Sequence, residues 1–387
     1  MADPDNYEDG YVLWVTSQDV KSNYLDRTTT QITEKGAKEL TLYPAGSLVM
    51  VTRSGILRHT LPVAELRKPS TVNQDIRVIL PQGECCGEWL LQFFISHNKE
   101  LLLEFGKTGT TVESVDFGKI KDMLLYMPST VEQQQIGDFF AKLDSLITLH
   151  QRKYDKLVIF KKSMLEKMFP KDGESVPEIR FAGFTDPWEQ RKFGDCFEFL
   201  KSNTLSRAGL NGENGTARNV HYGDILIKFG DCLDGERSDL PFITDDTVLP
   251  KFAGSILREG DVIFADTAED EAAGKCVELR KLPKEPTISG LHTIPARPRF
   301  FFGTGYLGHY LNSDAYHRQL LPLMQGIKVI SVSKAALQDT QVRFPGLSEQ
   351  AAIGAALSEI DNLITLHQRK LELLQNIKKS LLDKMFV

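Results

Sequence analysis

The side chains of this sequence that could most readily do chemistry are a group of carboxylates and a set of histidines. One loop carries Asp266, Glu269, Asp270 and Glu271, and clustered carboxylates are the ligands that hard divalent cations prefer. The composition of the loop is more typical of a surface turn. The eight histidines show neither H-x-x-x-H nor H-E-x-x-H spacing, which are the patterns of helical zinc sites. We therefore expect no bound metal and no cofactor.

Motifs for nucleotide hydrolysis and methyl transfer are missing from the sequence. It contains no G-x-x-x-x-G-K-[ST] loop, so a P-loop ATPase site is not expected. It also lacks an N/D-P-P-Y/F tetrapeptide of the adenine-methyltransferase type. The sequence predicts a chain that is not an enzyme, and any methyl chemistry must belong to a partner.

Composition narrows the class of protein further. The 387 residues are 41% hydrophobic and 25% charged, which is typical of a globular chain with two or three domains. No apolar run approaches the roughly 18 residues of a membrane helix, so we expect neither a secretory nor a membrane protein. Five cysteines without C-x-x-C spacing favour a reducing cytoplasm. The net charge of -6 indicates that bulk attraction alone cannot hold nucleic acid.

An internal repeat organises the chain. Residues 128–169 and 345–386 are identical at 22 of 42 positions and share the unbroken string LITLHQRK, an agreement that chance does not produce. The offset is 217 residues, and fainter agreement at this offset extends upstream. The repeat predicts the order domain, long helix, domain, long helix, with the domains as divergent copies.

Within both repeats, apolar residues recur in alternating steps of four and three, the pattern of a coiled-coil seam. The predicted seam positions are Ile136, Phe140, Leu143, Ile147, His150 and Leu157 in the first copy, and Ile353, Leu357, Ile360, Ile364, His367 and Leu374 in the second. About 38 helical residues would form a rod of about 57 Å. Polar interruptions at the two histidines, and at Lys161 and Lys378, either fix register and orientation or lie at a solvated edge. We expect the helices to pack antiparallel, with the two globular copies at opposite ends.

The globular copies have the pattern of an α+β fold. Short β-rich runs at 47–52, 75–80, 224–229 and 261–266 alternate with Gly, Pro and Asn, and each copy has one amphipathic helix, at about 87–105 or 304–321. The predicted boundaries are 1–128 for the first domain, 129–169 for the first long helix, 170–187 for a linker, 188–345 for the second domain and 346–387 for the second long helix. Paired domains on a pseudo-dyad suit a ligand that repeats along an axis, such as double-stranded DNA.

Several motifs resemble the DNA-specificity subunit of type I restriction-modification systems. They are WEQRKFGD (188–195), two GD-φ-φ-φ strand starts (223–227 and 260–264), DTAEDEAAGK (266–275), S-V-x-x-x-x-φ (114–120 and 331–337), P-x-x-x-EQ-x-x-I (128–136 and 345–353) and the two QRK helices. The resemblance covers nearly the whole chain. It implies two target-recognition domains, each reading one part of a bipartite site, with the helices setting the unread gap. It also implies docking of two methyltransferase subunits, restriction with added translocase-nuclease subunits, and no catalytic site in this chain.

The sequence departs from this family pattern in the first domain. The stretch 177–217 of the second copy has its counterpart about 40 residues before Met1 at the repeat offset. We therefore expect the first target-recognition domain to be incomplete at its start. A natural truncation, a rearranged allele and an expression fragment would each explain the pattern, and the domain would read DNA weakly or rely on another chain.

Base reading needs hydrogen-bonding side chains on loops, with Arg or Lys suited to guanine and Asn or Gln to adenine. The candidates in the first copy are Thr16, Ser17, Gln18, Arg53, Ser54, Arg58, His59, Lys107, Thr108, Thr110 and Thr111. Those in the second copy are His221, Tyr222, Lys228, Thr267, Gln325 and Lys328. A solvated loop or turn cap is the alternative for each. Two alternatives stand against DNA recognition as a whole: a protein-interaction scaffold, and a decoy that occupies modification subunits without directing specificity.

Overall fold

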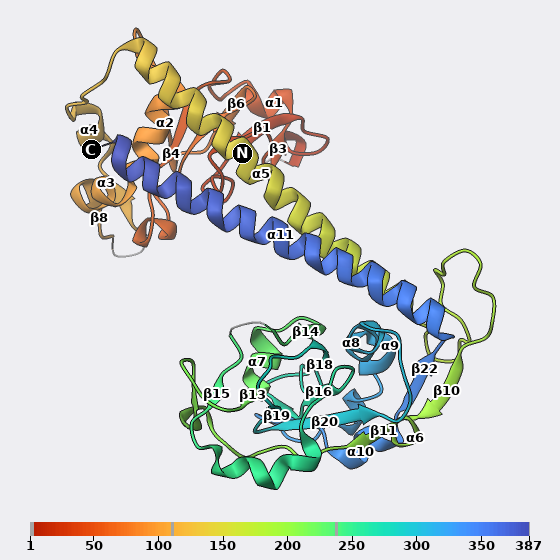
Figure 1. Ribbon diagram of the computed structural model, residues 1–387. Coiled ribbons are helices and arrows are strands. Elements are labelled where there is room, and N and C mark those ends of the chain that lie inside the picture. Colours follow the sequence, from red (N-terminus) through yellow and green to blue (C-terminus); the bar gives the residue numbers. More distant parts are fainter. Residues whose placement is uncertain (1–3, 110–111, 237–238, 387) are drawn as a thin grey trace. The chain divides into compact units, whose positions relative to one another are not determined.

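The computed structural model describes residues 4–109, 112–236 and 239–386, which fall into two compact units (Figure 1). Unit 1 comprises Met1–Arg152 and Gln368–Val387, and unit 2 comprises Lys153–His367. Two long helices, α5 (Thr130–Lys167) and α11 (Leu347–Met385), contribute residues to both units. None of the described helices is both long and apolar enough to cross a membrane.

Unit 1 is built on a four-stranded sheet in the order β2-β5-β4-β7. Its strands are β2 (Tyr24–Leu25), β4 (Leu48–Val51), β5 (Val63–Leu66) and β7 (Ile76–Ile79). A second sheet, in the order β3-β1-β6, contains β1 (Val12–Val15), β3 (Gln31–Ile32) and β6 (Ser70–Val72). The other elements are η1 (Pro4–Asn6), α1 (Glu34–Ala37), η2 (Gly55–Arg58), α2 (Gly87–Ser96), α3 (Asn98–Phe105), the pair β8 (Gly106–Lys107) and β9 (Ser114–Val115), and α4 (Phe117–Asp122).

The central strand β4 shows why this sheet lies between two cores. Successive side chains of a strand point to opposite faces. Leu48 and Met50 pack with α2 and the long helices, whereas Val49 and Val51 pack toward the smaller sheet. All four are fully buried. The helical layer is thus held on one face of the sheet, and the loops leave from the strand ends.

Unit 2 repeats this arrangement with additions. Its main sheet, in the order β11-β20-β16-β18-β14, contains β11 (Phe197–Phe199), β14 (Cys232–Asp234), β16 (Val262–Ala265), β18 (Cys276–Lys281) and β20 (Thr293–Pro298). The smaller sheet, β12-β15-β13-β19, contains β12 (Leu210–Asn211), β13 (Arg218–Val220), β15 (Phe242–Ile243) and β19 (Thr287–Ser289). Two strand pairs are β10 (Glu189–Lys192) with β22 (Gln341–Phe344), and β17 (Thr267–Ala268) with β21 (Ile330–Ser331). The helices are α6 (Phe193–Cys196), η3 (Arg207–Gly209), α7 (Tyr222–Ile227), η4 (Asp246–Ser255), α8 (Tyr306–Asn312), α9 (Asp314–His317), η5 (Leu321–Leu323) and α10 (Lys334–Asp339).

The strand order confirms the predicted α+β class and the duplication. The order β2-β5-β4-β7 of unit 1 matches β14-β18-β16-β20 of unit 2, including the parallel pairing of the first two strands in each set. We call residues at matching places in the two units equivalents. They are 217 positions apart from α2 and α8 onward, and at other offsets upstream where loop lengths differ.

Segments of α5 and α11 run in opposite directions within each unit, as predicted. In unit 1, Phe140 contacts Phe386 and Asp144 contacts Lys378, so one helix ascends as the other descends. In unit 2, Met164 and Ile360 join the same core, and Lys161 contacts Asp361. The antiparallel pairing is therefore observed separately in both units.

The predicted strand over 224–229, which is also the first GD-φ-φ-φ strand start at 223–227, is wrong. This segment forms α7, because the His221 side chain caps the helix by accepting from the Gly223 amide. Asp224 is buried beneath Arg207, to which it accepts two hydrogen bonds of 2.8 Å. A run of alternating Ile and Leu fits a short buried helix as well as a strand, and here the tertiary contacts decide.

The two predicted amphipathic helices are each broken. The first divides at His97 into α2 and α3. The second divides at Ser313, whose extended backbone (φ -73°, ψ 155°) separates α8 from α9. At the second break the Ser313 hydroxyl donates to the Tyr310 carbonyl, and this local bond competes with a continued helix.

Candidate nucleic-acid interface and the joints that support it

Two of the loops predicted to read DNA lie side by side in unit 1. Arg53, just after β4, forms an isolated bridge with Ser114, and the Ser54 amide donates to the Glu113 carbonyl at 3.1 Å. A groove of about 610 Å³ runs between the loops, and its lining includes the predicted residues Arg58, His59, Lys107 and Thr108. The structure therefore brings together most of the candidates from β4 onward.

The cations of this groove already have carboxylate partners. Arg58 Nε lies 2.5 Å from a Glu113 carboxylate oxygen, and Lys107 Nζ lies 2.8 Å from Asp116. The hydrogen bond from Arg58 lowers the pKa of Glu113, and the one from Lys107 lowers the pKa of Asp116. A phosphate or a base edge would have to displace these carboxylates from Arg58 and Lys107, whose side chains are 63% and 60% exposed, so that the ion pairs are weak.

The remaining candidates of unit 1 are placed differently. The Thr16 hydroxyl donates to Asp19 at 2.7 Å, and Asp19 also accepts from the Thr29 amide and hydroxyl, so Thr16 holds a turn. Gln18 is exposed and Ser17 half-buried beside it. Thr110 and Thr111 fall outside the described residues.

In unit 2 the matching place joins Thr267 and Gln325. Thr267 pairs with Ser331 across β17 and β21, and Ser331 in turn bridges to Gln325. Thr267 is the equivalent of Arg53, and Ser331 of Ser114, so the same position carries different chemistry in the two units. Lys328 lies in the exposed turn between Gln325 and Ser331.

His292 belongs to this cluster, although no motif of the sequence indicates it. Its Nδ1 lies 3.3 Å from Asp266, which also accepts from the Thr267 hydroxyl, and its ring lies 5.4 Å from that of Tyr222. Its φ of 52° is in the left-handed region, which a residue other than glycine adopts only at a cost. No sequence signal announces such a backbone angle, and strain of this kind gathers at functional positions.

The other candidates of unit 2 have structural partners. His221 is 7% exposed and caps α7, and its burial, with Arg207 nearby, lowers its pKa. Lys228 pairs with Asp224 at 3.1 Å. In the acidic loop, Asp270 accepts from the Ala272 amide in a turn, which agrees with the expected surface turn.

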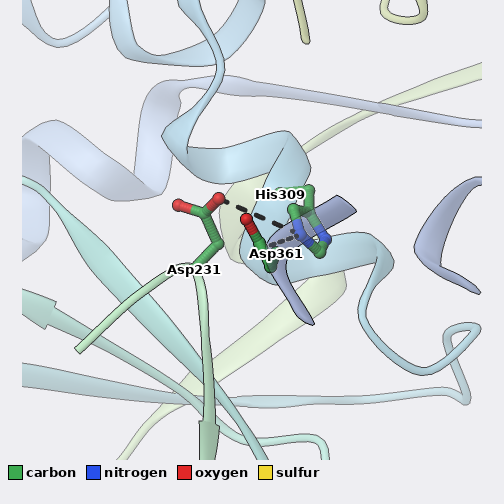
Figure 2. A group of neighbouring side chains, drawn as sticks. All are labelled: Asp231, His309 and Asp361. Atoms are coloured by element: carbon green, nitrogen blue, oxygen red, sulfur yellow. Dashed lines mark hydrogen bonds and ion pairs between the residues drawn. The ribbon is translucent and has the colours of Figure 1, made fainter. Parts of the chain in front are cut away.

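A different group of metal-ligand type lies beneath α11 in unit 2. Asp231, His309 and Asp361 converge from three elements, as Figure 2 shows. The centre of the group holds a cation of the chain itself, because Lys161 Nζ lies 2.6 Å from Asp231 and 2.5 Å from Asp361. Burial tends to raise the pKa of Asp361, but hydrogen bonds from His309 and Lys161 lower it overall. The seam lysine thus takes the position that a metal ion would need.

Both ring nitrogens of this histidine face hydrogen-bond acceptors. Nδ1 of His309 lies 2.5 Å from the Gly305 carbonyl oxygen, and Nε2 lies 3.0 Å from Asp361. These two contacts and the ion pairs of Lys161 hold the group together.

Unit 1 has an equivalent cluster around Asp144, in which two amide side chains replace His309 and Asp231. Lys378, the equivalent of Lys161, lies 2.6 Å from Asp144, the equivalent of Asp361. Gln92 replaces His309 and Asn23 replaces Asp231, and both amides donate to Asp144, at 3.4 and 2.9 Å. Both predicted seam lysines are therefore engaged in ion pairs, with Lys378 8% exposed. Such a pair supports one register of the helices over others.

The EQ-x-x-IG motif, which both repeats share, anchors each long helix to its domain. Gln133 accepts from the Cys86 amide at 2.9 Å, and Gln350 accepts from the Gly303 amide at 2.8 Å. A Cβ at Gly137 would lie 3.1 Å from the Trp89 nitrogen, so the close approach requires glycine. Gly354 has the same role in unit 2.

The remaining seam candidates lie along the same faces. The buried members are Ile136, Phe140 and Leu143 in unit 1 and Ile353 and Leu357 in unit 2, whereas Ile147, His150, Leu157, Ile360, Ile364, His367 and Leu374 are half-buried. The buried members belong to a domain core, and Ile147, Leu374 and Ile360 pack against one.

Comparison with known proteins shows similarity to one group of proteins. The family model "Type I restriction modification DNA specificity domain" matches residues 2–158. The EcoR124I/EcoR124II specificity subunit of Escherichia coli is 29% identical over 162 residues, which cover 38% of this chain and 40% of the relative. The MjaVIII specificity subunit of Methanocaldococcus jannaschii is 24% identical over 306 residues, covering 76% of this chain and 68% of the relative.

A solved structure supports the fold alone. The S subunit of a type I restriction-modification system from M. genitalium is 12% identical, with a TM-score of 0.53, and the match covers 97% of this chain and 92% of that one. Residues 2–158 thus match the DNA-specificity domain of type I restriction-modification systems, and the chain is similar to specificity subunits of such systems along most of its length.

Proposed function

We propose that this chain is the DNA-recognition subunit of a type I restriction-modification complex. Each unit reads one part of a bipartite site in double-stranded DNA, and α5 and α11 set the gap and dock two methyltransferase subunits. Translocase-nuclease subunits complete the restriction complex, and this chain supplies no catalysis. The names of the related specificity subunits support the role.

The proposal rests mainly on one pair of equivalent loop positions that carry different side chains in the two units. Arg53 in unit 1 and Thr267 in unit 2 occupy equivalent strand ends, next to the equivalent serines Ser114 and Ser331. A duplicated scaffold with different side chains at the same reading position suits two different half-sites.

The side chains suggest how the two readings differ. The loops of unit 1 carry Arg53, Arg58 and Lys107, and these side chains suit guanine O6 and N7 or backbone phosphates once Arg58 and Lys107 leave Glu113 and Asp116. Thr267 and Gln325 in unit 2 are neutral, and a glutamine amide can bind adenine in a bidentate manner. We expect the half-site of unit 1 to tolerate adenine less than that of unit 2.

The test is a gel-shift assay on DNA containing a candidate site, with and without the cognate modification subunits. Because the net charge is -6, we expect tight binding only when those subunits are present. Sequence-independent binding by the isolated chain would contradict the proposal. A complex that assembles normally but never prefers one sequence would favour the decoy.

A further inference from the structure

The segment that leads into the long helix is covered in unit 2 and open in unit 1. In unit 2 this segment is β22, which pairs with β10, and its Val342 and Phe344 are 0% and 4% exposed. In the equivalent segment of unit 1, Leu125 and Met127 take the places of Val342 and Phe344, and Leu125 is half-buried whereas Met127 is 46% exposed. Their neighbours Leu124 and Tyr126 are 84% and 89% exposed. No strand within the described residues pairs with it.

A hollow adjoins this open segment in unit 1. It has a volume of about 770 Å³, and its lining includes Trp89, Phe93, Tyr126, Glu132 and Phe386. The lining is largely apolar, and its charged members are three carboxylates and one lysine: Glu104, Asp122, Glu132 and Lys119. An apolar hollow with an excess of carboxylates in its lining favours a ligand that has both an aromatic and a cationic side chain.

In unit 2 the chain itself fills the equivalent place. The ring of Trp188 lies 6.1 Å from Tyr306, the equivalent of Trp89, and 6.4 Å from Phe169, the equivalent of Phe386. Trp188 is 8% exposed and immediately precedes β10. The residue that enters the hollow and the strand that covers the open segment therefore belong to one stretch of chain.

A carboxylate beside the hollow is also paired in unit 2 and unpaired in unit 1. In unit 2, Arg180 binds Glu349 through two hydrogen bonds of 2.6 and 2.7 Å. Glu132 is the equivalent of Glu349, is exposed, and has no ion pair among the described residues of the structure. Unit 1 thus offers a carboxylate where unit 2 shows a bound arginine.

The edge of the main sheet is the third matching feature. In unit 2, β11 adds to β20 as an antiparallel edge strand. In unit 1, β7 is the equivalent of β20 and is the last strand of its sheet, and Leu80 just beyond it is 47% exposed. Residues 177–199 supply all the covering features of unit 2: Arg180, Trp188, β10 and β11.

We propose that unit 1 is a docking surface for a segment of the 177–199 type, carried by a separate polypeptide. The segment would pair by strand addition with residues 124–127 and with β7, place an indole in the hollow, and pair an arginine with Glu132. The copy of this segment within residues 177–199 is already engaged in unit 2, so the occupant of unit 1 is another copy of the segment. This proposal does not depend on DNA recognition.

The experiment measures binding of a labelled synthetic peptide, residues 177–199 with Cys196→Ser, to the full chain by fluorescence anisotropy. We expect saturable binding that falls at least about tenfold when the peptide carries Trp188→Ala, because the indole fills the hollow. Tyr126→Lys in the chain should weaken binding to a similar degree. Ile327→Asp, at a position in unit 2 that is 98% exposed, is the matched surface control and should change nothing.

A charge exchange makes the test specific to the rim. Glu132→Arg in the chain should weaken binding about tenfold, and the peptide with Arg180→Glu should restore it on that variant only. Equal binding to the wild-type chain and to Tyr126→Lys would overturn the proposal. So would concentration-dependent dimerisation of the chain alone that Tyr126→Lys abolishes, because the occupant would then be a second copy.

Discussion

The ion pair between Lys378 and Asp144 allows a quantitative prediction about the stability of the contact between α5 and α11 in unit 1. Both side chains are nearly buried, with 11% and 8% of their surface exposed, and Nζ lies 2.6 Å from the carboxylate. Lys378→Met would leave that carboxylate with only amide donors from Asn23 and Gln92. Removal of one partner from a buried pair costs about 3–5 kcal/mol. We expect a loss of this size in unit 1.

A second substitution should recover most of the loss. Asp144→Asn removes the unpaired charge but keeps a carbonyl oxygen as acceptor for Asn23. The double variant should therefore recover more than half of the loss, since the buried charge is gone and only a neutral amide N–H is left without a partner. Lys379→Met is the matched control, because this neighbouring lysine is exposed and its loss should cost less than about 0.5 kcal/mol.

Native-state hydrogen exchange, read by mass spectrometry on peptides from residues 136–147 and 374–386, gives the local free energy of opening. Equal protection in Lys378→Met and Lys379→Met would refute the reasoning, as would an Asp144→Asn substitution that fails to recover protection. In unit 2, Lys161→Met should resist the same repair by Asp361→Asn, because Asp231 would remain charged.

Three further predictions concern packing, pH and salt. Gly354→Ala should destabilise unit 2 by about 1–3 kcal/mol in urea titration, because the new Cβ would meet the Thr304 carbonyl; an unchanged midpoint would contradict this close approach. Burial and the nearby Glu88 raise the pKa of Glu65 to about 7, so stability present below pH 4.5 should be lost as the pH rises through 7. Glu65→Gln should flatten that dependence in melting temperatures recorded from pH 4.5 to 8, and an unaltered profile would count against it. Arg53→Ala tests which part of the DNA Arg53 contacts in the assembled complex. If Arg53 contacts a phosphate, the slope of log affinity against log salt concentration should fall by about one. If it reads guanine, the slope should stay unchanged and one base preference should relax.

The repeat and the long helices were predictable because their signals are local. Twenty-two identities in 42 positions fix the duplication, and steps of four and three fix the buried face of each helix. The same spacing also identified Lys161 and Lys378 as polar residues on that otherwise apolar face. It could not name their partners, because Asp231 is 70 residues from Lys161 and Asp144 is 234 residues from Lys378.

The candidate site was predictable only as a set of loops. Arg58, Lys107 and Gln325 were selected for hydrogen-bonding capacity, and the structure adds which of them meet. His221 shows the limit of that approach, because a buried helix cap has the same residue type as a base contact. His292 was missed because its role depends on a backbone angle and on strand pairing that no short motif encodes.

The central claim is that two equivalent units read two different sequences. Methylome sequencing of a host that expresses this chain with its modification subunits tests it most directly. We expect one asymmetric motif with two specified parts and an unspecified gap, and Arg53→Ala should relax only one part if Arg53 reads a base. A single continuous motif, or a change in both parts from that one substitution, would contradict it.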